Sequence, residues 1–271
     1  MICLVIPLLG FVWFSWRYAW WRPTISTRVP RILMYHMVAP HSPGARFNGL
    51  RVTPKRFEQQ LVWLVRNNWT SLTVSELFCA GNAIPDKAVA LTFDDGFADN
   101  LYRALPLLEK YNCKATLYLV VDRHDREWSK AKKAHHDSGE LKLEVKLSDE
   151  EVREMLRSEL VELGSHTLTH PNFLNLPDEE KFAELTESKR VLEERFGVQV
   201  KSFAYPFGYF RGGDEQLVEH AGYSSAVTTE AGLNDLTRCS PYLLKRVKIS
   251  GKDNLLAFIL RMRGGRRGWN K

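Results

Sequence analysis

The chain has 271 residues, 44% of them apolar and 26% charged, which is the ordinary composition of a globular protein with one large α/β domain or two small ones. Its net charge of +6 is modest, and the excess basic residues are concentrated near the two ends, which favours a membrane surface over a nucleic-acid partner. Four scattered cysteines form no C-x-x-C pair, which excludes a disulfide framework and a cysteine-ligated zinc site.

The first predicted element is the stretch MICLVIPLLGFVWFSWRYAWW, which carries one charge, Arg17. As a helix it would be roughly 30 Å long, the thickness of a bilayer core, and its tryptophans gather at the far end as they do at membrane interfaces. We expect residues 1–21 to anchor the chain in the inner or cytoplasmic membrane, with a signal peptide as the alternative. Residues 22–30 form a basic linker, and the positive-inside rule would keep the chain from residue 22 onward in the cytoplasm.

From residue 31 onward, short apolar runs alternate with longer stretches of helical periodicity. Strands are expected near 31–38, 88–93, 114–121, 160–163, 201–204, 224–229 and 242–249, and helices near 54–69, 97–112, 148–158, 178–196, 214–221 and 252–262. Because strand and helix alternate at least six times, the pattern predicts a parallel sheet built from βα units, either open or closed into a barrel.

Domain boundaries can be drawn from the same pattern. Residues 31–262 form one α/β domain, and 263–271 form a basic tail for which a solvated end is the alternative to lipid contact. The polar and charged stretch 122–147 fits no strand or helix, and we expect it to be an inserted lid or surface loop.

Polar motifs follow three of the predicted strands. Asp94 and Asp95 end the run AVALTFDDG, His166 follows 160–163, and the YPFG motif follows 201–204. In parallel βα architectures, functional groups collect at the carboxyl ends of the strands. These three motifs are therefore expected to meet on one rim.

The motif HTLTH places His166 and His170 four residues apart, a spacing that lets two imidazoles share one metal ion if the segment forms a helical turn. The flanking Gly164 and Pro171 favour a turn or a very short helix. A carboxylate from TFDDG would complete a site of two histidines and one acid. A divalent cation there would also explain the adjacent aspartates, because it offsets one charge and leaves the other carboxylate to act as a base. The alternative for the pair is a helix N-cap followed by a first-turn acid.

In this order, TFDDG, HTLTH and YPFG resemble the motif series of the NodB-like polysaccharide deacetylases, which are metal-dependent carbohydrate de-N-acetylases. The similarity covers roughly residues 31–250. It implies a distorted (β/α) barrel of about seven parallel strands. The segments ILMYHMV and FAYPFG resemble the branch that deacetylates poly-N-acetylglucosamine and similar envelope glycans.

The resemblance also implies roles for individual residues. Asp95, His166 and His170 would bind the metal, with zinc the first choice and cobalt or nickel as alternatives, and Asp94 would be the general base. The loop Tyr205, Pro206, Phe207 and Gly208 would contact substrate, with the N–H of Tyr205 or Phe207 stabilising the oxyanion. For both aromatic side chains, an ordinary place in the core is the alternative.

The chain departs from the family pattern in two places. Many members carry an arginine just before the proline motif that braces the catalytic aspartate, and here Arg246 is the nearest candidate to replace it. Many members also carry a late histidine that protonates the leaving amine, and the late strand here has none. His36 follows the first predicted strand and could face the pocket, or could be an ordinary core or rim histidine.

These features together predict a membrane-anchored hydrolase that removes N-acetyl groups from N-acetylhexosamine units of a cell-envelope polysaccharide or glycolipid. Two alternatives remain open. An O-acetyl esterase could use the same metal site, and a glycan-binding module could keep the ligands without catalysis.

Overall fold

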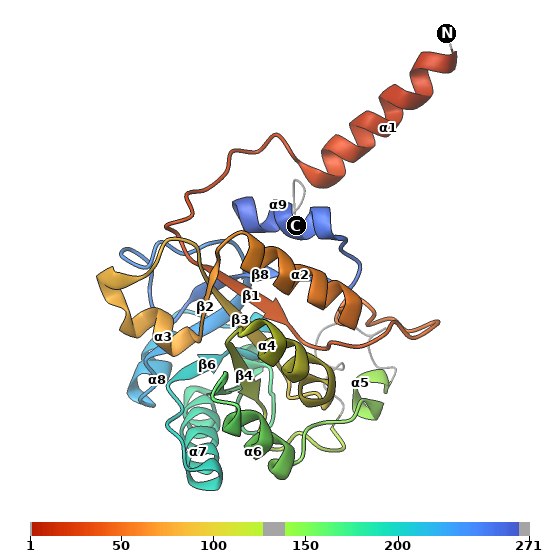
Figure 1. The fold of residues 1–271 in the computed structure, drawn as a ribbon. Coiled ribbons are helices and arrows are strands. Elements are labelled where there is room, and N and C mark those ends of the chain that lie inside the picture. The colour runs from red at the N-terminus through yellow and green to blue at the C-terminus, as the bar shows by residue number, and fades with distance from the viewer. Residues whose placement is uncertain (1, 127–138, 266–271) are drawn as a thin grey trace.

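Seven parallel strands close into a ring in the computed structural model, which describes residues 2–126 and 139–265 (Figure 1). The strands are β1 (Arg31–Tyr35), β2 (Thr70–Leu72), β3 (Ala88–Asp94), β4 (Ala115–Leu119), β5 (Val161–Ser165), β6 (Ser202–Ala204), β7 (Ser225–Ala231) and β8 (Leu244–Lys248). Their order is β1-β8-β7-β6-β5-β4-β3, and β3 pairs with β1 to complete the ring. The remaining strand, β2, lies outside the ring, where it pairs with the first half of β3 next to the start of β4. The predicted barrel of about seven parallel strands is confirmed.

Helices cover the outside of this barrel (Figure 1). The helices of the described domain are α2 (Pro54–Arg66), α3 (Val74–Cys79), α4 (Leu105–Tyr111), α5 (Glu140–Leu143), α6 (Asp149–Arg157), α7 (Asp178–Phe196), α8 (Asp214–His220) and α9 (Leu255–Gly264). The helix expected over 97–112 starts later, as a π-helical turn (Asn100–Ala104) that runs into α4. Pro106 lies in the first turn of α4, directly after the π-helical turn, so the helical hydrogen-bond pattern changes close to this residue, which has no N–H to donate.

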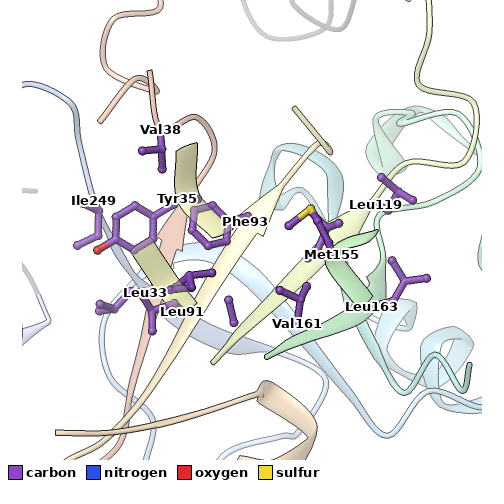
Figure 2. Packing of buried hydrophobic residues seen from close by; sticks show 14 of the residues in the cluster. Leu33, Tyr35, Val38, Leu91, Phe93, Leu119, Met155, Val161, Leu163 and Ile249 are labelled. Carbon is purple, nitrogen blue, oxygen red and sulfur yellow. The ribbon is translucent and has the colours of Figure 1, made fainter. Parts of the chain in front are cut away.

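Apolar side chains form one core outside the barrel and another inside it. Outside, alternate strand residues pack against the helices, and the rings of Tyr35 and Phe93 stack with centroids 5.5 Å apart (Figure 2). Inside, the intervening residues such as Ala90 and Leu244 form a second cluster that includes Val74 of α3. The chain therefore closes the amino end of the barrel with α3 and leaves the carboxyl ends of the strands for the polar side chains that follow them.

The N-terminal helix α1 (Ile2–Tyr18) has 17 residues and projects from the domain (Figure 1). It is shorter than the 1–21 segment expected to anchor the chain, because the backbone turns at Ala19, where φ is 45°. At 1.5 Å per residue it measures about 26 Å, less than a bilayer core. Among the described residues, no helix combines the length and the apolar character that a bilayer crossing requires. The expected transmembrane anchor is therefore not supported.

The predicted linker and the start of the predicted tail are hydrogen-bonded to each other and to the domain. The backbone of Ile25 donates a hydrogen bond to the carbonyl of Arg263 (2.9 Å), and the buried Arg31 guanidinium donates to the carbonyls of Ile25 (3.0 Å) and Met262 (2.9 Å). Residues 22–30 thus lie along α9, and Arg263 belongs to that helix and not to a tail. The rest of the basic tail, from 266, and residues 127–138 of the expected insertion lie outside the described part of the chain.

Candidate active site

Asp94 ends β3 and points into the barrel, on the same face of the strand as Ala90 and Thr92. There it meets Arg246 of β8, which donates two parallel hydrogen bonds to the carboxylate, with N–O distances of 2.7 and 2.8 Å. Both side chains are buried. The guanidinium also donates to the Thr228 carbonyl (2.8 Å) and the Thr92 hydroxyl (3.0 Å), so its orientation is fixed. The structure thus places Arg246 where a brace for the aspartate was predicted.

The Arg246 guanidinium decides the charge of Asp94. Burial alone would raise the pKa of the carboxyl, but the charge and hydrogen bonds of Arg246, with smaller contributions from His166 and His36, lower it below the ordinary aspartate value. Asp94 is therefore ionised at neutral pH in spite of its burial.

Asp95 turns away from Asp94 because the chain leaves β3 through two left-handed residues, Asp95 (φ 75°) and Gly96 (φ 74°). Asp95 carries the strain of this conformation, of order 1–3 kcal/mol for a residue with a side chain. At Gly96 a Cβ atom would lie only 2.4 Å from Cδ1 of Leu119, so glycine is required there for space as well as for backbone conformation. The turn therefore sends two neighbouring carboxylates to different surroundings.

Asp95, His166 and His170 form a buried cluster at the rim. One carboxylate oxygen of Asp95 lies 3.4 Å from His166 Nε2 and 3.5 Å from His170 Nε2, and the candidate ligand atoms all lie within 4.8 Å of one another. Nδ1 of His166 donates to the carbonyl of Ala204 (2.7 Å), and because a carbonyl can only accept, the proton of neutral His166 must be on Nδ1. Its Nε2 lone pair then faces Asp95.

Divalent-metal binding suits this cluster chemically. Burial and the neighbouring His166 lower the pKa of His170 to about 3, against the opposing effect of Asp95, so its imidazole is neutral at neutral pH. Burial would raise the pKa of the Asp95 carboxyl, but its contact with His166 and its proximity to His36 and His170 lower it overall. A carboxylate and two neutral imidazoles are a donor set that zinc and similar cations prefer. Asp95, His166 and His170 could therefore hold such a cation.

The two histidines meet through a turn and not through a helix. Residues 166–170 follow β5 as an irregular bend, with positive φ at Thr167 (73°) and His170 (59°). The Thr167 hydroxyl accepts a hydrogen bond from the His170 amide (2.9 Å). Glu184 of α7 accepts from the amides of Leu168 (2.8 Å) and Thr169 (2.9 Å) and so holds the bend from outside. Glu184 could not be identified from the sequence, because it is one of many charged residues on a long polar helix.

The YPFG loop places Phe207, but not Tyr205, at the site. The Phe207 ring lies 4.6 Å from the His170 ring, and the loop is held close to β7 because a Cβ on Gly208 would lie 2.0 Å from the Thr229 hydroxyl oxygen. Pro206 is buried at the start of this turn. The Tyr205 ring is fully buried among core aromatics, and its N–H donates to the carbonyl of Val227 (3.1 Å).

The expectation that Tyr205 contacts sugar or supplies an oxyanion hydrogen bond is therefore wrong. Its side chain fills the core, and its amide is used in pairing with β7. Phe207 remains the candidate for both tasks.

His36 lies at the same rim, a position that both of its expected placements allow. It follows β1, whose register pairs Tyr35 with Phe93 of β3, so the two strands end side by side. His36 is half-buried, and it lies close enough to the acidic pair and to His170 to contribute to the pKa shifts of all three.

The barrel and the acidic and histidine side chains at the carboxyl ends of its strands are typical of an enzyme. Comparisons with known proteins identify the family. A family model described as polysaccharide deacetylase matches residues 81–226, more than half of the chain. The Bacillus subtilis protein YxkH, whose name assigns it to the polysaccharide deacetylases, is 32% identical over 235 residues, covering 86% of this chain and 75% of that protein. A crystal structure of a polysaccharide deacetylase from Bacillus cereus is similar with a TM-score of 0.72 and 28% identity, covering 86% of this chain and 69% of that one.

The chain therefore belongs to the polysaccharide deacetylase family of hydrolases. It is also 26% identical over 256 residues to the poly-beta-1,6-N-acetyl-D-glucosamine N-deacetylase of Escherichia coli K12, a match that covers 83% of this chain. The chain spans only 37% of the length of that relative.

Replacing Arg246 with methionine should destabilise the protein by about 3–5 kcal/mol at neutral pH, because it leaves the Asp94 carboxylate buried without a partner. The lowered pKa of Asp94 means that the pair stabilises the fold above the ordinary aspartate pKa of about 4, and that this contribution is lost as the pH falls toward the lower folded-state value. Chemical denaturation across pH should therefore show the deficit shrinking in acid.

The double variant Asp94→Asn/Arg246→Met is the matched control for this prediction. It removes both charges and should be more stable at neutral pH than Arg246→Met alone. Equal stability of the single and double variants would contradict the assignment of the deficit to an unpaired carboxylate.

Proposed function

We propose that this protein hydrolyses the N-acetyl groups of N-acetylhexosamine units in a cell-envelope polysaccharide or glycolipid. The observation that carries this proposal is the separation of the two adjacent carboxylates. Asp94 is held ionised by Arg246, whereas Asp95 turns to two imidazoles in a donor set suited to a divalent cation. The names of the relatives support the substrate class, since one of them acts on poly-beta-1,6-N-acetyl-D-glucosamine.

A divalent cation held by Asp95, His166 and His170, zinc first and cobalt or nickel as alternatives, would polarise the acetyl carbonyl and make water more acidic. Asp94 then serves as the general base that accepts a proton from the attacking water. Its bidentate contact with Arg246 keeps the carboxylate ionised and fixes its direction.

Two further groups complete the reaction. The backbone N–H of Phe207 donates to the oxyanion, in place of Tyr205, whose amide pairs with β7. His36 supplies the proton that the departing sugar amine requires. This assignment rests on the position of His36 beside the acidic pair. It also provides the proton donor that the late strand lacks.

Replacing Asp94 with asparagine should lower the rate of acetate release by about 10²- to 10⁴-fold, because the amide cannot accept the proton of the attacking water. The measurement is acetate release by the full-length protein from N-acetylglucosamine oligomers and from extracted envelope glycolipid, with added zinc or cobalt. Metal content, measured in parallel, should be unchanged because Asp95 and the two histidines remain.

The same assay separates the other functions. Release from O-acetylated glycans alone would identify an esterase and contradict de-N-acetylation. Binding of the oligomers without any acetate release would identify a glycan-binding module. Full activity of Asp94→Asn would remove this residue as the base.

We propose further that residues 2–21 attach the protein to a membrane surface without crossing the bilayer. Apolar side chains of α1 are exposed, among them Leu9 (63%), Val12 (55%) and Trp16 (66%), which share one face of the helix, and Arg17 and Arg22 lie near the neighbouring cluster of tryptophans. Because the cytoplasmic leaflet is the one that carries a negative surface potential, the arginines near the C-terminal end of the helix favour a cytoplasmic catalytic domain.

Replacing Leu9, Val12 and Trp16 together with serine should abolish flotation of the full-length protein with vesicles that contain anionic lipid, because these side chains supply the exposed apolar surface. Serine at three exposed apolar positions elsewhere on the domain (Val65, Tyr102 and Leu256) is the matched control and should leave flotation intact. Equal flotation of the α1 variant and the unaltered chain would contradict this attachment.

A further inference from the structure

Asp99 and Asn100 hold the backbone that follows β1. The Asp99 carboxylate accepts a hydrogen bond from the Val38 amide, with an N–O distance of 2.6 Å. The Asn100 amide donates to the His36 carbonyl (2.9 Å) and to the same Asp99 oxygen (3.1 Å). Two consecutive side chains are thus hydrogen-bonded to the peptide groups on either side of Met37, and we call this arrangement the 99–100 clamp.

An ordinary helix cap does not explain the 99–100 clamp. Asp99 stands at the N-cap position of the π-helical turn, where an aspartate normally accepts from the helix's own amides, but its side chain makes no such bond. The carboxylate reaches across to the segment after β1 instead. Asn100 is fully buried, and burial raises the pKa of Asp99 to about 6, so the arrangement keeps polar groups out of water at a cost.

The 99–100 clamp joins the two segments that carry the reacting groups. Asp99 lies four residues beyond Asp95 in the turn that leaves β3, and its partner Val38 lies two residues beyond His36 on the segment that leaves β1. Between these polar contacts, Phe97 packs in one apolar cluster with Met37 and Ala39, so the two segments also share a small core. The backbone of His36 is therefore fixed relative to the acidic pair.

We propose that Asp99 and Asn100 are positioning residues that orient His36 for protonation of the leaving amine. The inference rests on the proposed function, in which His36 supplies that proton. Neither side chain belongs to the candidate metal cluster of Asp95, His166 and His170. Asp99 and Asn100 hold the two peptide groups that follow His36, and in this way they keep its imidazole near the leaving amine.

The test compares two substrates that differ in their need for a proton donor. A sugar amine is a poor leaving group and must be protonated, whereas the phenolate of p-nitrophenyl acetate leaves without a proton. Replacing Asp99 with alanine should lower kcat for N-acetylglucosamine oligomers by about tenfold to a hundredfold, and should leave p-nitrophenyl acetate hydrolysis and metal content within about twofold. The conservative variant Asp99→Asn keeps an oxygen for the Val38 amide and should restore most of the lost rate.

Two further variants make the test decisive. Asn100→Leu, which keeps the volume but removes the donor to His36, should show the same loss on the amide substrate alone. Adding Asp99→Ala to His36→Ala should cause no further loss on the amide substrate, because the two residues act through one group. Equal losses on both substrates, or a fully additive double variant, would overturn the positioning role. Absence of amide hydrolysis by the unaltered protein would instead overturn the proposed function itself, and the two failures are therefore distinguishable.

Discussion

The ion pair between Asp94 and Arg246 is the interaction on which the site depends. It joins β3 to β8 across the inside of the barrel, where both charges are removed from water. A buried pair of this kind is costly to assemble and more costly to break, so the barrel interior around it must keep one geometry. Because the guanidinium already neutralises Asp94, the adjacent Asp95 is the carboxylate left for a cation. Two identical side chains, neighbours in sequence, thereby acquire different electrostatic surroundings.

Strained backbone is present where these surroundings diverge. Asp95, His170 and Phe207 are non-glycine residues with positive φ, and all three lie at the carboxyl edge of the barrel. Each conformation is held by its neighbours: Gly96 lets the first turn close, Thr167 caps the second, and the third turn packs against β7. The closed barrel, plugged below by α3, provides the rigid base that makes such strain tolerable and preorganises the site.

Much of this arrangement could be predicted from the sequence because its signals are local. Helix α7 has the predicted bounds, since first-turn acids and a terminal glycine mark its ends, and the regular βα alternation predicted the barrel. Arg246 could be predicted as the nearest candidate for the brace because this sequence lacks the arginine that the family pattern places before the proline motif.

Other features depend on contacts that no local pattern contains. The three residues of β2 and the six of α3 are too short to give a periodic signal. The left-handed residues of the 166–170 bend, the burial of Tyr205 and the roles of Glu184 and the 99–100 clamp arise only when distant strands meet.

The central claim, that Asp95 binds a cation while Asp94 does not, is tested most directly by anomalous X-ray scattering at the zinc edge from crystals grown with zinc. We predict one peak about 2.0–2.2 Å from Asp95, His166 and His170, with Asp94 still paired to Arg246. A peak coordinated by Asp94, or a zinc-loaded crystal without a peak at these three residues, would contradict the account.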